Sequence, residues 1–128
     1  NLYNYFLILK IKVYFNGNIK QHIFFMKEAK FSIGQIIHHQ KFNYRGVIFD
    51  VDPIFSLTNE WYEEIAKSKP PKDSPWYHVL KDNSEQATYV AEQNLTDAKS
   101  ILPINHPLIN YYFDNFSDGK YFSANINN

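Results

Sequence analysis

Short runs of apolar residues, separated by polar turns, mark the middle of the chain. Residues 31–40, with Gly34 at a bend or bulge, predict a first strand. Residues 46–52 predict a second strand, which Pro53 stops. The polar residues 41–45 lie between the two runs, so the pattern predicts a β-hairpin.

Two short helices are predicted outside this hairpin. Either Thr58 or Asn59 can cap a helix in which Trp61 and Ile65 lie four residues apart on one face. The second helix is predicted to open at His106, which precedes a proline.

Two further strand-like segments complete the pattern. Residues 67–75 form a connector rich in proline and lysine, and residues 76–80 and 89–95 are apolar and aromatic enough to predict a third and a fourth strand. The chain has no internal repeat and no regular alternation of strands and helices. We therefore predict a mainly β fold, a small antiparallel β-barrel with one or two short helices.

The two ends of the chain do not share this pattern. Residues 1–25 are dominated by amino acids whose codons can be built from A and T alone, and Met26 is the first methionine. We interpret residues 1–25 as a non-native upstream extension, residues 26–114 as the domain and residues 115–128 as a flexible tail. The alternative is a genuine extension that adds an edge strand around residues 8–15.

Charge and composition narrow the function classes. The chain has 13 basic and 13 acidic residues; without Lys10, Lys12 and Lys20, the rest carries a formal charge of −3. A net acidic domain binds DNA only through a local basic patch. The absence of cysteine excludes disulfides, thiolate metal sites and cysteine nucleophiles. The apolar run near the start is too short to cross a membrane, so we expect a cytoplasmic protein.

Few residues are spaced for catalysis or metal binding. His38 and His39 are neighbours on a predicted strand, so their side chains point to opposite faces and do not suit one ion. Asp50 and Asp52 share a strand face about 7 Å apart and could in principle act as paired carboxylates; we interpret them instead as residues that end a strand, with Asp52 setting up the turn at Pro53. We find no nucleotide-binding glycine motif and no nucleophile elbow. We expect no catalytic residue, no metal and no cofactor, and therefore no enzyme.

The turn at residues 39–45 interleaves Lys41 and Arg45 with Phe42 and Tyr44. Basic residues beside aromatic rings can hold a phosphate and stack on a base. Our hypothesis for DNA contact is therefore Lys41, Tyr44 and Arg45. The alternative is a solvated turn in which Tyr44 packs back and Arg45 pairs with a nearby carboxylate.

The proline-rich connector is a candidate for binding a protein partner. It carries Lys67, Lys69 and Lys72 and leads directly into Trp76. Prolines hold an exposed loop in shape, and lysines with an aromatic residue suit a docking surface. The alternative is a solvated loop followed by a core aromatic residue.

Several ordered blocks resemble the HspQ family, also called the YccV-like or hemimethylated-DNA-binding proteins. The blocks are FSIGQ at 31–35, FNYRGVIFDVDP at 42–53, EWY at 60–62, PWYH at 75–78, YVAEQNL at 89–95 and HP at 106–107. The resemblance covers about residues 28–114. The family commonly carries arginine as well as lysine in the connector, and this chain has lysine only.

The resemblance implies a small β-barrel that self-associates, as a trimer. It also implies two activities. One is binding of hemimethylated DNA near the replication origin. The other is a heat-shock role as a partner of the ATP-dependent protease Lon in degrading substrates that include the replication initiator. The negative charge of the domain favours a purely protein-binding adaptor, whereas the family description favours DNA, and both stay open.

Overall fold

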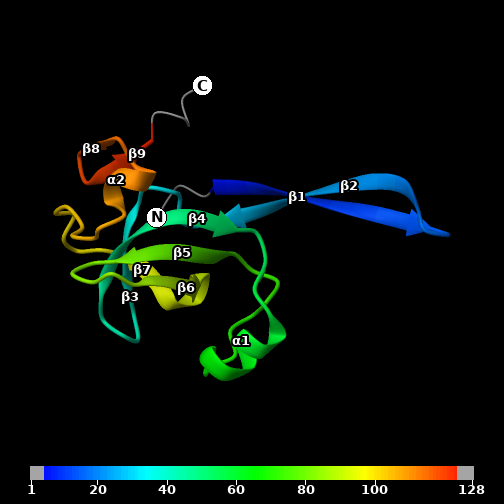
Figure 1. Cartoon of the computed structure of the whole chain (residues 1–128), viewed down its shortest axis with the longest axis horizontal. Helices are drawn as coiled ribbons and strands as arrows, with labels where there is room; N and C mark the ends of the chain where they lie inside the picture. The colour runs from blue at the N-terminus through cyan, green and yellow to red at the C-terminus, as the bar shows by residue number, and fades with distance from the viewer. Residues whose placement is uncertain (1–4, 124–128) are drawn as a thin grey trace.

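An antiparallel five-stranded sheet forms the centre of the molecule (Figure 1). The computed structural model describes residues 5–123 of the 128-residue chain. The strands lie in the order β6-β5-β4-β3-β7. Their bounds are β3 Ile36–His39, β4 Arg45–Asp52, β5 Trp76–Lys81, β6 Ala87–Ala91 and β7 Leu95–Asp97.

The sheet curls strongly but does not close. β6 and β7 are its two edges, yet only the three-residue 3-10 helix η1 (Glu92–Asn94) joins them. Three residues of 3-10 helix span about 6 Å, so the two edges approach each other at this end. The mainly β prediction is confirmed. A barrel closed by hydrogen bonds is not what forms, because β6 pairs with β5 alone.

The central strands are buried on both faces. Neighbouring side chains of a strand point to opposite sides. In β5, Val79 belongs to a core cluster on the concave side with Ile48, Tyr77 and others, whereas Leu80 belongs to a second cluster. The second cluster is covered by the C-terminal segment from residue 104 onward. This double burial explains why adjacent residues such as Val47–Ile48 and Val79–Leu80 are both apolar, rather than alternating with polar ones.

The first predicted strand begins later than expected. Residues 31–35 form a turn, and β3 starts at Ile36. Gly34 has a φ of +91° and lies so close to Tyr121 that an added Cβ would overlap the Tyr121 carbonyl. The Gly34 N–H donates to the Ile48 carbonyl at 2.8 Å, so this turn is tied to the sheet. Glycine is therefore required here by both conformation and space.

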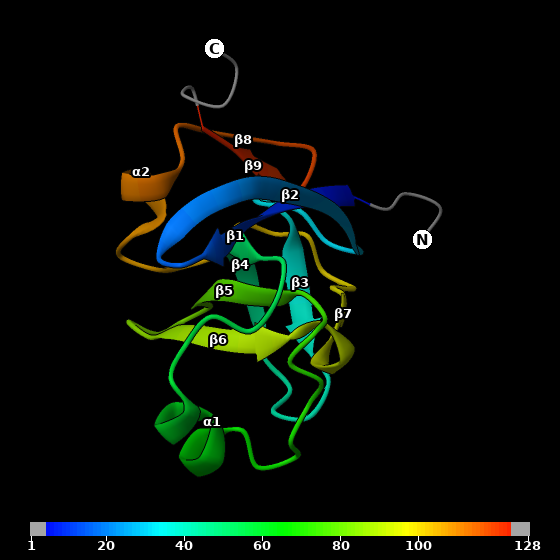
Figure 2. The same ribbon diagram turned by 90° about the vertical axis from the view of Figure 1, so that its right-hand side faces the viewer.

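Two short α-helices flank the sheet at opposite ends (Figure 2). Helix α1 (Asn59–Ile65) is capped by Thr58, whose Oγ1 accepts the Trp61 backbone N–H at 3.1 Å. Helix α2 (Ile109–Tyr112) begins three residues after His106. The predicted helices are therefore both present, and Thr58 rather than Asn59 is the N-cap. Within the described residues, no helix has the length and hydropathy needed to span a bilayer.

Part of the predicted C-terminal tail is folded. β8 (Asn115–Ser117) and β9 (Lys120–Phe122) form a hairpin around Asp118 and Gly119, both with positive φ. Tyr121 is buried, and its hydroxyl accepts the Ile104 N–H at 2.8 Å. The expectation of a flexible tail is thus wrong for residues 115–122, because an aromatic side chain anchors them in the core. Residues 124–128 lie outside the described part.

A separate hairpin precedes the domain. β1 (Tyr5–Phe15) pairs antiparallel with β2 (Asn18–Ala29) as a two-stranded sheet of its own. The strand suggested as an alternative at residues 8–15 is therefore present, paired with β2 and not with the main sheet. β2 also runs across the expected boundary at Met26, and Ala29 at its end is buried. The interpretation of residues 1–25 as non-native stays a prediction.

Candidate functional site

Arg45 is the most heavily bonded residue of the predicted DNA-contact set. Its guanidinium donates to the carbonyls of Ser100 and Leu102, both at 2.8 Å, and to that of Pro103 at 3.3 Å. It also forms an ion pair with Asp82 at 2.9 Å, and its side chain is only 21% exposed. This geometry matches the alternative of an arginine paired with a carboxylate. Arg45 therefore fastens the loop at residues 100–103 to the sheet.

Lys41 and Tyr44 belong to a turn with three stacked rings, those of Phe42, His39 and Tyr44. Lys41 is exposed, whereas Tyr44 is half-buried and its hydroxyl is 2.8 Å from Thr88 Oγ1. The Tyr44 ring has His39 on one side, at 5.1 Å between centroids, and Lys81 Nζ 5.0 Å from its own centroid. Burial raises the pKa of the Tyr44 hydroxyl. Lys81 thus lies against Tyr44, and it was not predicted from the sequence because it lies 40 residues from Lys41 along the chain.

His39 organises the turn after β3. It is buried, and its Nδ1 accepts the backbone N–H groups of Lys41 and Phe42 at 3.1 and 3.0 Å. The proton of the neutral ring therefore sits on Nε2. Burial above all, and then the neighbouring charges of His38 and Lys41, lower the pKa of His39. Phe42, stacked on His39 at 4.7 Å, is 75% exposed.

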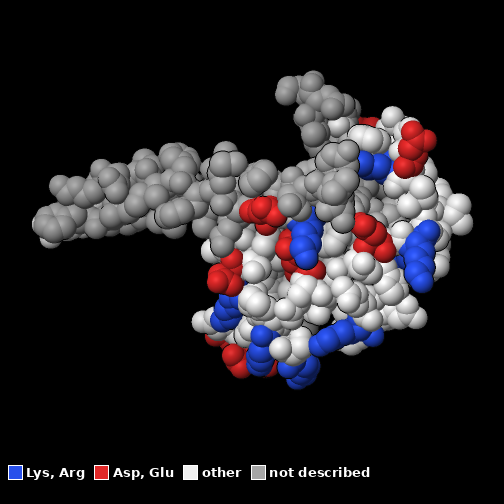
Figure 3. All heavy atoms as spheres, turned by 180° about the vertical axis from the view of Figure 1, so that it is seen from behind, with Lys and Arg blue, Asp and Glu red and all other residues white. Residues whose placement is uncertain are grey.

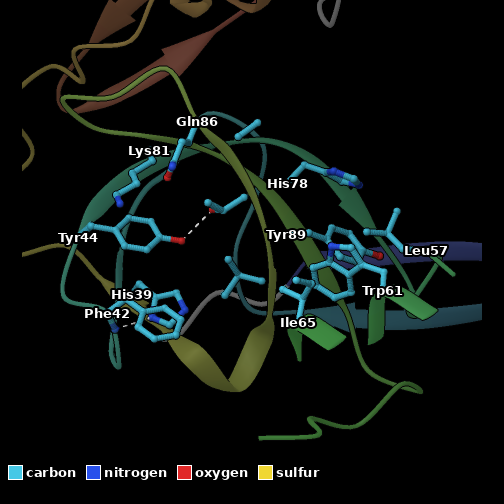
Figure 4. Close-up of a pocket in the computed structure, with 13 residues that line it drawn as sticks. His39, Phe42, Tyr44, Leu57, Trp61, Ile65, His78, Lys81, Gln86 and Tyr89 are labelled. Carbon is cyan, nitrogen blue, oxygen red and sulfur yellow. Dashed lines mark hydrogen bonds between the residues drawn. The ribbon is translucent and has the colours of Figure 1, made fainter. Parts of the chain in front are cut away.

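A groove runs along the free edge of β6, and we call it the β6 groove. It consists of a cavity of about 540 Å³ and a smaller one of about 120 Å³ that share several lining residues. Its walls come from the turn 39–44, from residues 57–70, from β5 and from β6 itself (Figure 4). Three lysines line it, Lys41, Lys67 and Lys81, and no aspartate or glutamate does. The groove is therefore aromatic and locally basic.

The charge elsewhere is mixed. On the face seen from behind, basic and acidic side chains are interspersed, and neither sign forms a continuous patch there (Figure 3). Helix α1 carries Glu60, Glu63 and Glu64, all exposed, next to the groove. The local positive charge of the β6 groove is thus a feature of its lining, set within a balanced surface.

The three lysines of the connector differ in the contacts that their side chains make. Lys69 Nζ donates to the carbonyls of Tyr62 and Glu63 at 3.1 and 2.9 Å, and it also pairs with the Glu63 carboxylate. Lys72 Nζ donates to Asn59 Oδ1 and lies 4.3 Å from the centroid of the Tyr62 ring. Lys67 is exposed and lines the β6 groove. The connector is therefore held in place by two of its lysines and presents the third.

Trp76 does not belong to the surface of the connector. Its side chain is only 1% exposed and packs with Tyr62, Ala66 and Ala91. Its indole N–H donates to the Pro71 carbonyl at 3.0 Å. This corrects the prediction that Trp76 contacts a partner, because β5 turns the indole inward to form the core under α1.

One cluster has the donor atoms to hold a metal ion. Asp50, Asp52 and His78 place one ligand atom each within 4.8 Å of the others. Their donor atoms already have partners. Asp52 Oδ2 accepts the Tyr89 hydroxyl at 2.7 Å and lies 3.0 Å from His78 Nε2, and Asp50 Oδ1 accepts the Val51 N–H. The cluster is therefore explained by its own hydrogen bonds, which end β4 and orient Tyr89 beside the β6 groove.

The fold and the groove define a small, mainly β domain with an aromatic and basic groove along one sheet edge. The family model described as hemimethylated DNA-binding protein YccV-like matches residues 29–120, more than half of the chain. The protein belongs to this YccV-like family. The resemblance seen in the sequence is thereby confirmed, and the match extends it from residue 114 to the β8–β9 hairpin.

Proposed function

We propose that this protein binds DNA and prefers the hemimethylated duplex. The observation that carries this proposal is the family match over residues 29–120. The lining of the β6 groove supports it, because its three lysines have no carboxylate among the lining residues, and lysines are what binds a phosphate backbone. The overall charge balance of the chain supplies no general attraction, so the affinity depends on this local patch.

The proposed phosphate contacts are Lys41 and Lys81, which both line the β6 groove. Phe42 supplies the exposed ring against which a base or sugar can pack. Tyr44 supports the surface, since its ring is already in contact with His39 and Lys81. Arg45 acts indirectly by fixing the start of β4, because its donors are directed at Asp82 and three carbonyls.

Binding to methylated, hemimethylated and unmethylated duplexes, measured by fluorescence anisotropy over a series of salt concentrations, tests this proposal. Lys41→Gln should weaken binding and reduce the slope of log K against log salt by about one unit. Lys30→Gln is the matched control, because Lys30 is exposed and does not line the groove. Equal binding to the three duplexes contradicts the hemimethylated preference, and absence of binding contradicts the DNA function.

A second candidate function is that of a partner in regulated proteolysis by Lon. The observation that favours it is the preformed connector, in which Tyr62 and Trp76 donate to the carbonyls of Pro70 and Pro71 at 2.7 and 3.0 Å. A loop that is already ordered loses little conformational entropy on docking. A homotrimer would present three copies and add avidity.

A reconstituted degradation assay with purified Lon tests the second candidate. Lys67→Glu should reduce any acceleration, because Lys67 is the exposed lysine of the connector; Lys99→Glu is the control on another loop. Light scattering after gel filtration measures the oligomeric state. If the protein accelerates no substrate, including the replication initiator, the proteolytic role is refuted.

A further inference from the structure

β6 has an unpaired edge. Lys81 N–H donates to the Gln86 carbonyl, and Glu92 N–H donates to the Pro75 carbonyl, so the hydrogen-bonded pairs with β5 include Thr88 and Val90. The backbone N–H and C=O groups of Ala87 and Tyr89 therefore point away from β5. Among the described residues, none bonds to these groups. Two residues with free donors and acceptors thus lie along the β6 groove, at the part of β6 that is not buried.

The groove has a wall on each side of this edge. On one side lie His39, Phe42 and Tyr44 from the turn after β3. On the other side lie Leu57, Trp61 and Ile65, from α1 and the residues before it. Figure 4 shows the two groups on opposite sides of β6. A strand added to an edge places successive side chains on opposite faces, so each wall would receive alternate side chains.

The walls are unusually apolar for exposed surface. Phe42 is 75% exposed and Ile65 is 57% exposed, and they face each other across the groove with Leu57 nearby. The charged residues of the lining are Lys41, Lys67 and Lys81, without any acid. The complementary ligand is therefore apolar at its centre and acidic at its ends.

We propose that the β6 groove binds an extended, acidic segment of a partner protein as an added β-strand. Ala87 and Tyr89 form the backbone hydrogen bonds, the two walls take alternate apolar side chains, and the three lysines pair with aspartate or glutamate at the ends of the segment. This function goes beyond DNA binding, and it does not depend on it.

The free backbone groups favour a peptide over a single strand of nucleic acid. Ala87 and Tyr89 repeat donor and acceptor at a spacing of two residues, about 6.8 Å, which is the period of another β-strand. An edge strand without a partner is usually blunted by lysine, proline or a covering element. β6 reads Ala-Thr-Tyr-Val-Ala and carries none of these residues, and α1 flanks its accessible part.

The probe is a phage-displayed library of random dodecapeptides, selected on the full chain. The expected enrichment is of sequences with apolar residues at alternate positions and acidic residues near the ends. An enriched peptide, resynthesised with a fluorophore, should bind with a Kd in the micromolar range. Methylation of backbone nitrogens at alternate positions of that peptide should weaken binding at least tenfold, and methylation at the intervening positions should have little effect.

Hydrogen exchange followed by NMR locates the peptide. In the free protein, the amides of Thr88 and Val90 should exchange slowly and those of Ala87 and Tyr89 quickly. Saturation with the enriched peptide should slow exchange of the Ala87 and Tyr89 amides at least tenfold. Protection of these two amides in the protein alone at high concentration would mean that a second copy uses this edge, and it would overturn the proposal.

Three variants test the contacts. Ile65→Ser removes an exposed wall residue and should weaken binding of the peptide at least fivefold. Ala87→Pro removes an N–H that does not bond to β5, so the pairing of β6 with β5 should stay intact. Binding of the peptide should weaken at least tenfold. Tyr111→Ser is the control, since Tyr111 is 77% exposed on α2, outside the groove. Tryptophan fluorescence and thermal melting check that each variant is folded.

The proposal is wrong if the selection yields no alternating acidic peptides, or if the selected peptides leave the Ala87 and Tyr89 amides unchanged. It is also wrong if a twelve-nucleotide thymidine oligonucleotide binds in place of the peptides, and Ile65→Ser weakens binding of that oligonucleotide as much as binding of a peptide. Neither Ile65 nor Ala87 is among the proposed DNA contacts. A failure of the peptide site would therefore leave the duplex measurements unaffected, and the two proposals fail separately.

Discussion

Replacement of Arg45 by alanine should destabilise the protein substantially while leaving the salt dependence of DNA binding unchanged. The substitution removes the donors to the carbonyls of Ser100, Leu102 and Pro103 and the ion pair with Asp82 at 2.9 Å. Asp82 also accepts the Asn105 N–H at 2.7 Å, so the loss spreads to the next loop. The Asp82 side chain, which is 13% exposed in the intact protein, would lose its counter-ion.

The magnitude follows from the kind of bond lost. A hydrogen bond to a charged group contributes about 1.5–3 kcal/mol, and breaking a well-buried ion pair costs about 3–5 kcal/mol. Arg45 is partly exposed, so water can reach some of the released acceptors. We expect Arg45→Ala to lower the free energy of unfolding by about 2–4 kcal/mol. Arg45→Lys keeps the charge but loses the planar fork, and we expect about half of this loss.

Urea denaturation followed by the fluorescence of Trp61 and Trp76 measures this change, with Lys41→Ala as the matched exposed control. The control should shift the free energy by no more than about 0.5 kcal/mol. A shift of Arg45→Ala within the same limit would refute the structural role. A folded Arg45→Ala protein whose DNA salt slope falls by about one unit would restore Arg45 as a phosphate contact.

Two further substitutions test the turns around the site. Gly34→Ala should lower the free energy of unfolding by at least about 3 kcal/mol in the same urea assay, because a Cβ at positive φ would overlap the Tyr121 carbonyl and displace β9. A loss below about 1 kcal/mol contradicts this close approach. His39 should make stability fall as pH drops below about 6.5, because its lowered folded-state pKa means that the unfolded chain takes up the proton first. Thermal melts at pH 7.5 and 5.0 should show a smaller difference for His39→Asn, whose side-chain oxygen can still accept the turn N–H groups; an equal difference contradicts the role of His39.

The sequence predicts best what depends on local pattern. β4 and β5 are found nearly at their predicted bounds because apolar residues are buried on both of their faces. The fourth predicted strand is divided in the structure, because η1 turns the chain from one sheet edge to the other. The three polar residues Glu92–Asn94 interrupt the apolar pattern here, but a break of three residues does not show that the chain passes to the other edge of the sheet.

The C-terminal hairpin has a sequence signal in its turn, at Asp118 and Gly119. Asp118 and Gly119 form the two-residue type of turn that joins hairpin strands, and both have positive φ. The flanking strands have three residues each, too short for a pattern of alternation to stand out. Their stability comes from Tyr121, which packs on Phe113 and Phe116, and from the bond of the Tyr121 N–H to the Gly34 carbonyl. That long-range contact is not visible in the local sequence.

The candidate site was predictable only in part, for a similar reason. Lys41 and Tyr44 are close in sequence, so their turn could be read directly. Lys81 joins them because β5 pairs with β4 at Gly46, and Arg45 leaves the site because its acceptors lie 37 to 58 residues away. Segment composition therefore singles out the turn at residues 39–45, and it gives Arg45 a role that the tertiary hydrogen bonds of Arg45 do not support.

The open edge of β6 links the curled sheet to its capacity for binding. A closed barrel would pair this edge and leave no backbone donor for a ligand. Here η1 leads to β7, which pairs with β3, and the outer edges of β6 and β7 do not pair with each other. The walls formed by the turn after β3 and by α1 then flank the edge. A second copy would carry the same walls on both sides of its own β6, so the two edges would meet wall against wall before they could pair. A single extended segment has no such walls, and the geometry therefore favours a peptide strand over edge-to-edge association.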